Sequence, residues 1–307
     1  MRTVRSVETA LSRLFADGEV PGFIHLSIGQ EAVAAGVCCA LRDGDTVATT
    51  HRGHGHVLAR GIDLDAFFME IMGKADGICA GRGGSMHVSD MRLGIIGANG
   101  IVGAGIPIAL GSALAHQTRD CDAVAVAFFG DGAMAEGVLH ESLNMAALWR
   151  LPLLLVCENN GWSEFSPTSR QFVAKLALLA KAFDIRHAQV DGNDVEAVAS
   201  AAVTMVASLR GGSGPAILEC ITRRVRGHYE GDPQKYRPAE ELAALEAGDP
   251  IAIARRALVA AGVESRELDA LDEAVEQATA QSIERARAAS EPAFDEALLG
   301  VYATGSA

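Results

Sequence analysis

The residues most able to do chemistry lie between positions 124 and 162, in two short polar clusters. Gly130-Asp131-Gly132 ends one apolar run, and Glu158-Asn159-Asn160-Gly161 ends the next. A carboxylate and an amide carbonyl are oxygen ligands that Mg²⁺ prefers, and the glycines let backbone approach a ligand closely. Water and phosphate oxygens would fill the remaining positions. The pattern therefore predicts a magnesium diphosphate site with Asp131 and Asn160 as ligands.

The flanking sequence predicts a framework that brings these clusters together. Apolar runs at residues 124–129, 153–157 and 216–221 are typical of buried strands, and residues 136–149 and 195–209 have helical patterns. This alternation predicts an α/β fold with a mainly parallel sheet and helices on both faces. Because parallel strands joined by a right-handed crossover end on the same side, both clusters should meet at one sheet edge.

The composition changes after Asp249-Pro250, where Ala, Glu and Arg become frequent. Residues 251–261 and 268–289 have helical patterns there. We find neither an internal repeat nor a low-complexity linker. The simplest interpretation is a diphosphate- and magnesium-binding domain at residues 1–249, followed by a helical C-terminal extension at residues 250–307 that packs on the domain or on a partner.

Length and composition indicate a globular protein and exclude several functions. The chain has 307 residues, 49% of them apolar, and a formal charge of -13, with no run of lysine and arginine. A basic face for nucleic acid or anionic membrane is therefore not expected. The six cysteines form neither a C-x-x-C pair nor a zinc-type spacing. With no signal-peptide pattern and no membrane-span run, we expect a soluble cytoplasmic protein.

The diphosphate motif resembles the thiamine diphosphate-binding signature. In this chain Gly130-Asp131-Gly132 is followed at the matching spacing by Asn160, and both clusters end apolar strands. The resemblance implies that Mg²⁺ is bound by Asp131, Asn160 and the backbone carbonyl of Trp162. It also implies that Gly132 and Ala133 contact the cofactor.

Further segments resemble the alpha subunits of thiamine diphosphate-dependent dehydrogenases that serve lipoyl-bearing complexes. They lie at residues 22–32, 50–56, 81–87, 99–104 and 226–228, so the likeness covers nearly all of the first 240 residues. It implies the thiamine diphosphate-binding fold. It also implies roles for individual residues, with cofactor contacts at His51, Arg52, Gly100 and Val102 and acid/base catalysis by His25 and His228.

The chemistry of these residues suits the implied roles. The planar cation of Arg52 can hold a phosphate in a bidentate manner, and His51 stands where many relatives have a phosphate-binding tyrosine. Gly100 lacks a side chain that would keep the cofactor at a distance. A partly neutral imidazole at His228 can exchange protons with a reacting group, and His25 is expected in the substrate pocket.

The resemblance also implies partners, because thiamine catalysis needs a second carboxylate beside the pyrimidine ring. Relatives carry it on a beta subunit, so we expect an alpha-two beta-two tetramer that passes an acyl group to a lipoyl-bearing acyltransferase. Residues 227–232 (Gly-His-Tyr-Glu-Gly-Asp), together with residues 158–164, resemble acetoin dehydrogenases, and pyruvate or a branched-chain 2-oxo acid is the alternative substrate. Tyr229 and Glu230 replace the serines of kinase-regulated relatives, so phosphorylation there is not expected. Acidic side chains at Glu164 and Glu230 would disfavour an anionic substrate.

Three other interpretations fit less well. His51, His54 and His56 could form a metal cluster, but the pattern has no acidic partner and Arg52 within it would repel a cation. The glycine run at residues 100–105 lacks the spacing and the acidic ribose ligand of a dinucleotide-binding turn. A scaffold that has lost activity should have lost its polar site residues first, whereas this chain keeps them.

Overall fold

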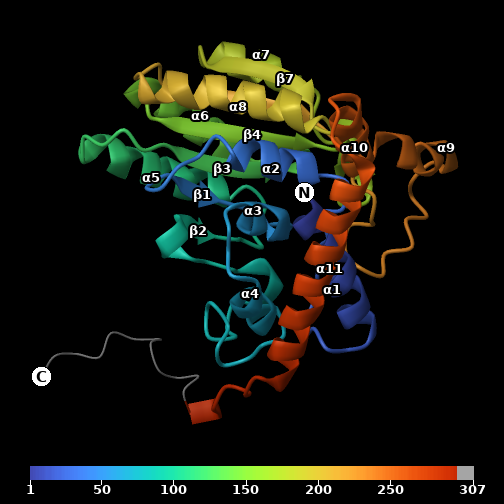
Figure 1. Cartoon of the computed structure of the whole chain (residues 1–307). Coiled ribbons are helices and arrows are strands. Elements are labelled where there is room, and N and C mark those ends of the chain that lie inside the picture. Colours follow the sequence, from blue (N-terminus) through green and yellow to red (C-terminus); the bar gives the residue numbers. More distant parts are fainter. Residues whose placement is uncertain (296–307) are drawn as a thin grey trace, which may run out of the picture.

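The computed structural model describes residues 1–295 of the chain, and its centre is a six-stranded parallel sheet (Figure 1). The strand order is β2-β1-β3-β4-β8-β7, and every neighbouring pair is parallel. The strands are β1 Thr46–Ala48, β2 Ile95–Gly97, β3 Ala125–Gly130, β4 Leu153–Asn159, β7 Arg186–Asp191 and β8 Ala216–Ile221. A separate antiparallel ribbon joins β5 Trp162–Ser163 to β6 Ser166–Pro167.

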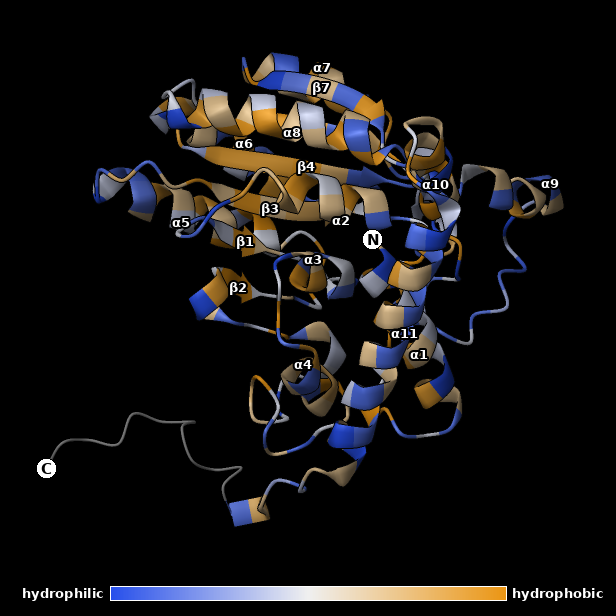
Figure 2. Ribbon diagram, in the orientation of Figure 1, coloured by the Kyte–Doolittle hydropathy of each residue, from blue (hydrophilic) through white to orange (hydrophobic). Residues whose placement is uncertain are grey.

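Helices cover both faces of the sheet, as the sequence predicts. Alternate residues of β3 face opposite cores: Phe129 packs with α5 (Gly105–Thr118), α6 (Gly137–Trp149) and α7 (Leu176–Ala182), while Phe128 packs with α2 (Glu31–Cys38) and α8 (Val195–Arg210). Figure 2 shows the apolar character of the central strand β4 between these layers. Because both faces are buried, the strands appear in the sequence as continuous apolar runs rather than as alternating ones.

A third apolar core holds the helices below the sheet in Figure 1. These helices are α1 Arg2–Ala16, α3 His54–Ala59, α4 Leu64–Ile71 and α11 Ser265–Ala288. Leu11 of α1 and the neighbouring Phe67 and Phe68 of α4 are fully buried there, and α11 contributes Ala286. The C-terminal extension thus packs on the rest of the chain. Residues 296–307 of the predicted extension lie outside the described residues.

The two helices of the extension have defined starts. Asp249 caps α10 (Pro250–Ala260) by accepting hydrogen bonds from the backbone of Ile251 and Ala252, and Pro250 occupies the first turn. The long helix α11 starts at Ser265, three residues before the apolar pattern that predicted it, because polar residues form its first turn. The remaining short elements are α9 Ala239–Ala243 and the 3-10 turns η1 Gly84–Met86, η2 Met91–Leu93, η3 Asp131–Ala135, η4 Thr168–Arg170 and η5 Glu246–Gly248.

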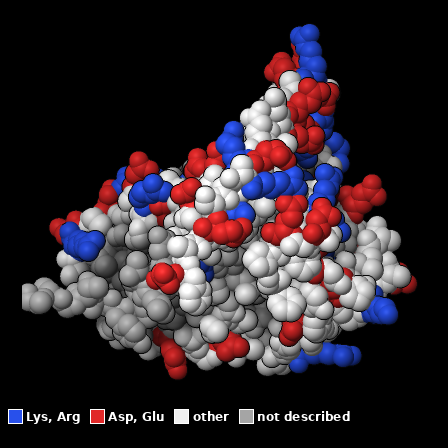
Figure 3. All heavy atoms as spheres, turned by 90° about the horizontal axis from the view of Figure 1, so that it is seen from below, with Lys and Arg blue, Asp and Glu red and all other residues white. Residues whose placement is uncertain are grey.

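Charged side chains of both signs share the face of the molecule that Figure 3 shows. On the face shown in Figure 3, lysine and arginine are interspersed with aspartate and glutamate and do not gather in one basic patch. Within residues 1–295, no helix has both the length and the apolar character that crossing a membrane requires.

Candidate active site

One cavity of about 270 Å³ opens at the carboxyl ends of β3 and β4. Open parallel sheets bind ligands at this edge, because the loops that follow the strands converge there. Every residue that the sequence predicts for cofactor binding or catalysis lines this cavity: His25, His51, Arg52, Gly100, Val102, Asp131, Gly132, Ala133, Asn160, Trp162 and His228. The structure therefore brings the whole predicted set together.

The carboxylate of Asp131 is buried with one oxygen unpaired. Thr168 donates its hydroxyl to Oδ2, whereas Oδ1 has no hydrogen-bond partner among the described residues. Burial raises the pKa of Asp131 to about 6, more than the Thr168 hydrogen bond lowers it. A buried carboxylate oxygen without a partner is costly unless a ligand satisfies it. The arrangement fits a cation bound at Oδ1.

Asn160 and Trp162 are held by the turn that leaves β4. Gly161 adopts φ +78°, a conformation that glycine reaches without strain, in the bend between β4 and β5. The Asn160 side chain donates to Oε1 of Gln30 at 2.9 Å, and its Oδ1 accepts from the backbone N–H of Trp162 at 3.1 Å. Gln30 is buried and also lines the cavity, although no sequence motif singles it out.

Two buried guanidinium groups line the cavity. Arg52 donates to the backbone carbonyls of Leu26 at 2.7 Å and His228 at 2.9 Å. Burial, reinforced by the nearby charge of Arg224, lowers the pKa of Arg52 to about 9. Arg224 was missed in the sequence, although its place just after strand β8 could have indicated it. Two cations in one cavity suit a diphosphate.

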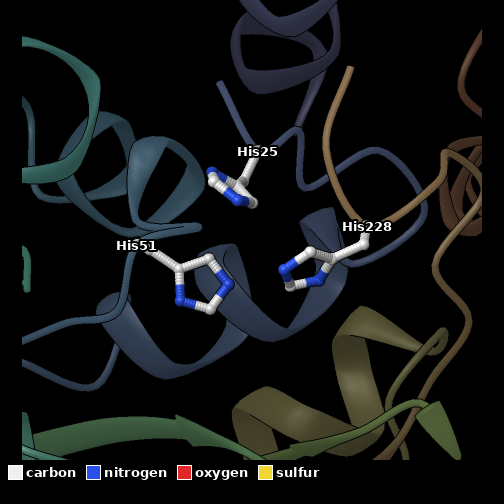
Figure 4. A group of neighbouring side chains, drawn as sticks. All are labelled: His25, His51 and His228. Atoms are coloured by element: carbon white, nitrogen blue, oxygen red, sulfur yellow. The ribbon is translucent and has the colours of Figure 1, made fainter. Parts of the chain in front are cut away.

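Three imidazoles face one another across the same cavity (Figure 4). The ring of His25 lies 4.7 Å from that of His51 and 5.1 Å from that of His228, measured between centroids. Burial, followed by repulsion from Arg52, lowers the pKa of His25 to about 3, of His51 to about 2 and of His228 to about 4. All three rings are therefore neutral at pH 7.

The other two histidines of the His51 motif serve the framework. The ring nitrogens of His54 lie 2.8 Å from Oγ of Ser85 and 3.3 Å from a carboxylate oxygen of Glu8. His56 stacks on Phe128, and its ring nitrogens contact Thr49 and Glu158. A metal cluster of His51, His54 and His56 does not form.

The glycines of the cavity differ in what they leave room for. A Cβ at Gly132 would lie 2.6 Å from Oγ of Ser163, so the neighbouring ribbon requires a glycine there. A Cβ at Gly100 would meet nothing closer than 3.8 Å. Protein packing thus does not explain Gly100, which leaves room for a bound molecule. Val102 stands at the mouth with 48% of its surface exposed.

The expectation that Glu164 and Glu230 both lie near the substrate is right for Glu164 and wrong for Glu230. Glu164 lines the cavity, as expected, and its backbone carbonyl accepts a hydrogen bond from Arg224. Glu230 instead turns to helix α1, where its carboxylate accepts from Ser12 at 2.7 Å, and it is not among the residues lining the cavity. The backbone of Glu230 pairs with Ile24, which fixes this direction.

Comparison with known proteins supports the same family. The model of the dehydrogenase E1 component matches residues 1–295. The alpha subunit of acetoin:2,6-dichlorophenolindophenol oxidoreductase from Bacillus subtilis is 44% identical over 310 residues, which cover 98% of this chain and 91% of the relative. The corresponding subunit from Cupriavidus necator is 45% identical over 307 residues, with 98% and 92% covered. The alpha subunit of the pyruvate dehydrogenase E1 component from Zymomonas mobilis is 42% identical over 299 residues, with 96% and 84% covered. This chain belongs to the dehydrogenase E1 component family, whose enzymes are thiamine diphosphate-dependent oxidoreductases.

Proposed function

We propose that this chain is the alpha subunit of a dehydrogenase that cleaves acetoin oxidatively and passes the acetyl group to a lipoyl-bearing acyltransferase. It would work with a beta subunit in an alpha-two beta-two tetramer, in keeping with the subunit names of its relatives. When bound, thiamine diphosphate supplies a nucleophilic carbon that cleaves a bond next to a carbonyl group.

The observation that carries this proposal is the unpaired Oδ1 of Asp131 in the cavity. Asp131, Asn160 and the carbonyl of Trp162 would hold Mg²⁺, an oxygen-binding cation that leaves positions for diphosphate oxygens. His51 and Arg52 would hold the diphosphate. Gly132 and Ala133 would line its path, and Gly100 and Val102 would lie against the rings of the cofactor.

The two remaining histidines would act on the substrate. His228 is neutral at pH 7, because burial and the charge of Arg52 lower its pKa to about 4. A neutral imidazole accepts a proton, so His228 can take the hydroxyl proton of acetoin as the carbon–carbon bond breaks. His25 is more deeply buried, with 9% of its surface exposed, and would orient the substrate oxygen.

Acetoin is preferred here over pyruvate for two reasons. The acetoin-cleaving relatives are 44% and 45% identical, and the pyruvate dehydrogenase subunit from Zymomonas mobilis is 42% identical. Glu164 also lines the cavity, and an acidic residue there would disfavour an anionic substrate. Pyruvate or a branched-chain 2-oxo acid is the alternative substrate.

The assay that tests the substrate compares kcat/KM of the complete complex on acetoin, pyruvate and branched-chain 2-oxo acids, with a dye as electron acceptor. We expect the highest value with acetoin. A preference of about tenfold or more for pyruvate would overturn the acetoin assignment and leave the cofactor assignment in place.

The magnesium assignment is tested by calorimetric titration of thiamine diphosphate into the complex with and without Mg²⁺. We expect Asp131→Ala to abolish magnesium-dependent binding, because it removes the anionic ligand of the metal. Asp122→Ala is a matched control, since Asp122 is an exposed partner of Arg42 outside the cavity. Unchanged affinity in Asp131→Ala would refute the assignment.

A further inference from the structure

Three histidines from distant parts of the sequence could bind a metal together. His25 follows helix α1, His51 precedes helix α3, and His228 belongs to the loop after β8. One ligand atom from each ring can be chosen so that all three lie within 4.8 Å of one another. Figure 4 shows the rings turned toward a common centre.

The nitrogens of this cluster are available to a ligand. The side chains of all three histidines lack a hydrogen bond to protein in the described part of the chain, and Nδ1 of His25 and of His228 is buried without a partner. Three neutral imidazoles with an open fourth position are the ligand set of zinc sites.

The spacing requires a small adjustment. Zinc–nitrogen bonds are about 2.0–2.1 Å long, so three nitrogens around one tetrahedral ion lie about 3.4 Å apart. The rings must therefore turn inward by roughly 1 Å at the nitrogen, which side-chain rotation within a rotamer well permits.

The charges of Arg52 and Arg224 oppose a cation at this place. Two features reduce the opposition: Arg52 donates to two backbone carbonyls, and the carboxylates of Glu8 and Glu158 act on it with the opposite sign. The repulsion should lower the affinity for zinc without abolishing it.

We infer that the cofactor-free chain binds one Zn²⁺ ion through His25, His51 and His228, and that this ion and the diphosphate exclude each other. The ion and the diphosphate should exclude each other because His51 and Arg52 are the proposed diphosphate ligands. This exclusion rests on the proposed function. The zinc site is distinct from the oxygen site of Asp131 and Asn160, which suits Mg²⁺.

The test titrates Co²⁺, a spectroscopic substitute for Zn²⁺, into the full-length chain after cofactor and metals have been removed by dialysis against a chelator. Tetrahedral nitrogen sites give Co²⁺ strong visible absorption, whereas octahedral oxygen sites give weak absorption. We expect one equivalent with strong absorption, displaced by Zn²⁺. His25→Gln, His51→Gln and His228→Gln should each weaken binding about tenfold or more, with folding checked by circular dichroism.

Three control variants separate this site from others on the chain. Asp131→Asn should keep the strong absorption, because it changes only the oxygen site. Cys121→Ser should keep it too, which excludes the pair in which Sγ of Cys121 lies 3.7 Å from His116. His140→Gln removes an imidazole outside the cavity and should have no effect.

The outcomes distinguish the zinc site from the proposed function. The zinc site is overturned if all three histidine variants bind Co²⁺ as tightly as the unmodified chain does. It is also overturned if only Asp131→Asn loses the strong absorption. Thiamine diphosphate with Mg²⁺ should displace the bound Co²⁺; simultaneous binding of both overturns the exclusion. The displacement is repeated with the complete complex, because the proposed function places part of the cofactor site on the beta subunit. Failure of the complex to bind thiamine diphosphate contradicts the proposed function, whereas the strong Co²⁺ absorption of the three histidine variants tests the zinc site independently.

Discussion

At the scale of single residues, Asp131 shows how a binding site is kept at the expense of stability. Its pKa rises to about 6 in the folded chain, because burial disfavours the carboxylate. A raised pKa means that the folded state is favoured while the group is protonated. The stabilising contribution of protonated Asp131 is complete below the pKa of the unfolded chain, near 3.8. It is lost as the pH rises through the folded pKa of about 6.

Asp131→Asn should therefore stabilise the cofactor-free chain at neutral pH. We expect the free energy of unfolding to rise by about 1 to 3 kcal/mol at pH 7 and to change little at pH 4. Urea denaturation at both pH values measures the difference. A loss of stability at pH 7 would contradict the pKa shift.

The two substrate histidines should differ in their kinetic effects. His228→Ala removes the proton acceptor, so we expect kcat to fall roughly 10²- to 10⁴-fold. His25→Ala should raise KM at least as clearly as it lowers kcat, because His25 orients the substrate. Steady-state kinetics of the complex on acetoin separate the two, with His140→Ala as control. A normal kcat in His228→Ala would show that His228 is not the proton acceptor.

At the scale of elements, the carboxylate of Asp232 ties the loop that carries His228 together from within. Asp232 accepts hydrogen bonds from the backbone N–H of His228 at 2.7 Å and from the hydroxyl of Tyr236 at 2.6 Å. A Cβ at Gly227 would lie 2.4 Å from the Cβ of Asp232, so the close turn requires glycine. These contacts place His228 in the cavity.

Tyr236→Phe tests this loop, because it deletes the hydrogen bond that Tyr236 donates to Asp232, together with the one that it accepts from Arg224 at 3.0 Å, and keeps the ring. We expect a fall in kcat of up to about tenfold and faster proteolytic cleavage within residues 226–237. Tyr229→Phe is the matched control, since Tyr229 packs by its ring on Phe23. Equal effects of the two variants would show that Asp232 and Tyr236 do not hold the loop.

At the scale of the whole molecule, the cavity mouth carries exposed apolar side chains. Ile101 is 72% exposed and Val102 is 48% exposed, beside a cavity that would hold a cofactor. Apolar side chains around a ligand site are typical of surfaces that another subunit covers.

We therefore expect the purified chain alone to show no turnover, and the addition of the cognate beta subunit to restore it. The reason is that the carboxylate needed beside the pyrimidine ring is expected on that subunit. Dye reduction with acetoin, measured before and after mixing, gives the result. Steady turnover by the chain alone would disprove the requirement.

The sequence by itself determined the sheet centre and the metal motif. Strands β3, β4 and β8 are buried on both faces, so they appear as continuous apolar runs, and parallel strands necessarily end on one side. The other three strands of the six-stranded sheet escaped prediction for local reasons. β1 and β2 have three residues each, and the edge strand β7 is partly exposed and polar.

Only the tertiary structure decided which distant side chains meet. The convergence of His25, His51 and His228, and the presence of Arg224 among them, depend on how three loops pack over the sheet edge. The outward turn of Glu230 is fixed by Ser12, far away in the sequence. Strand periodicity sets which face a residue occupies, whereas a loop side chain takes its direction from tertiary contacts that no local pattern records.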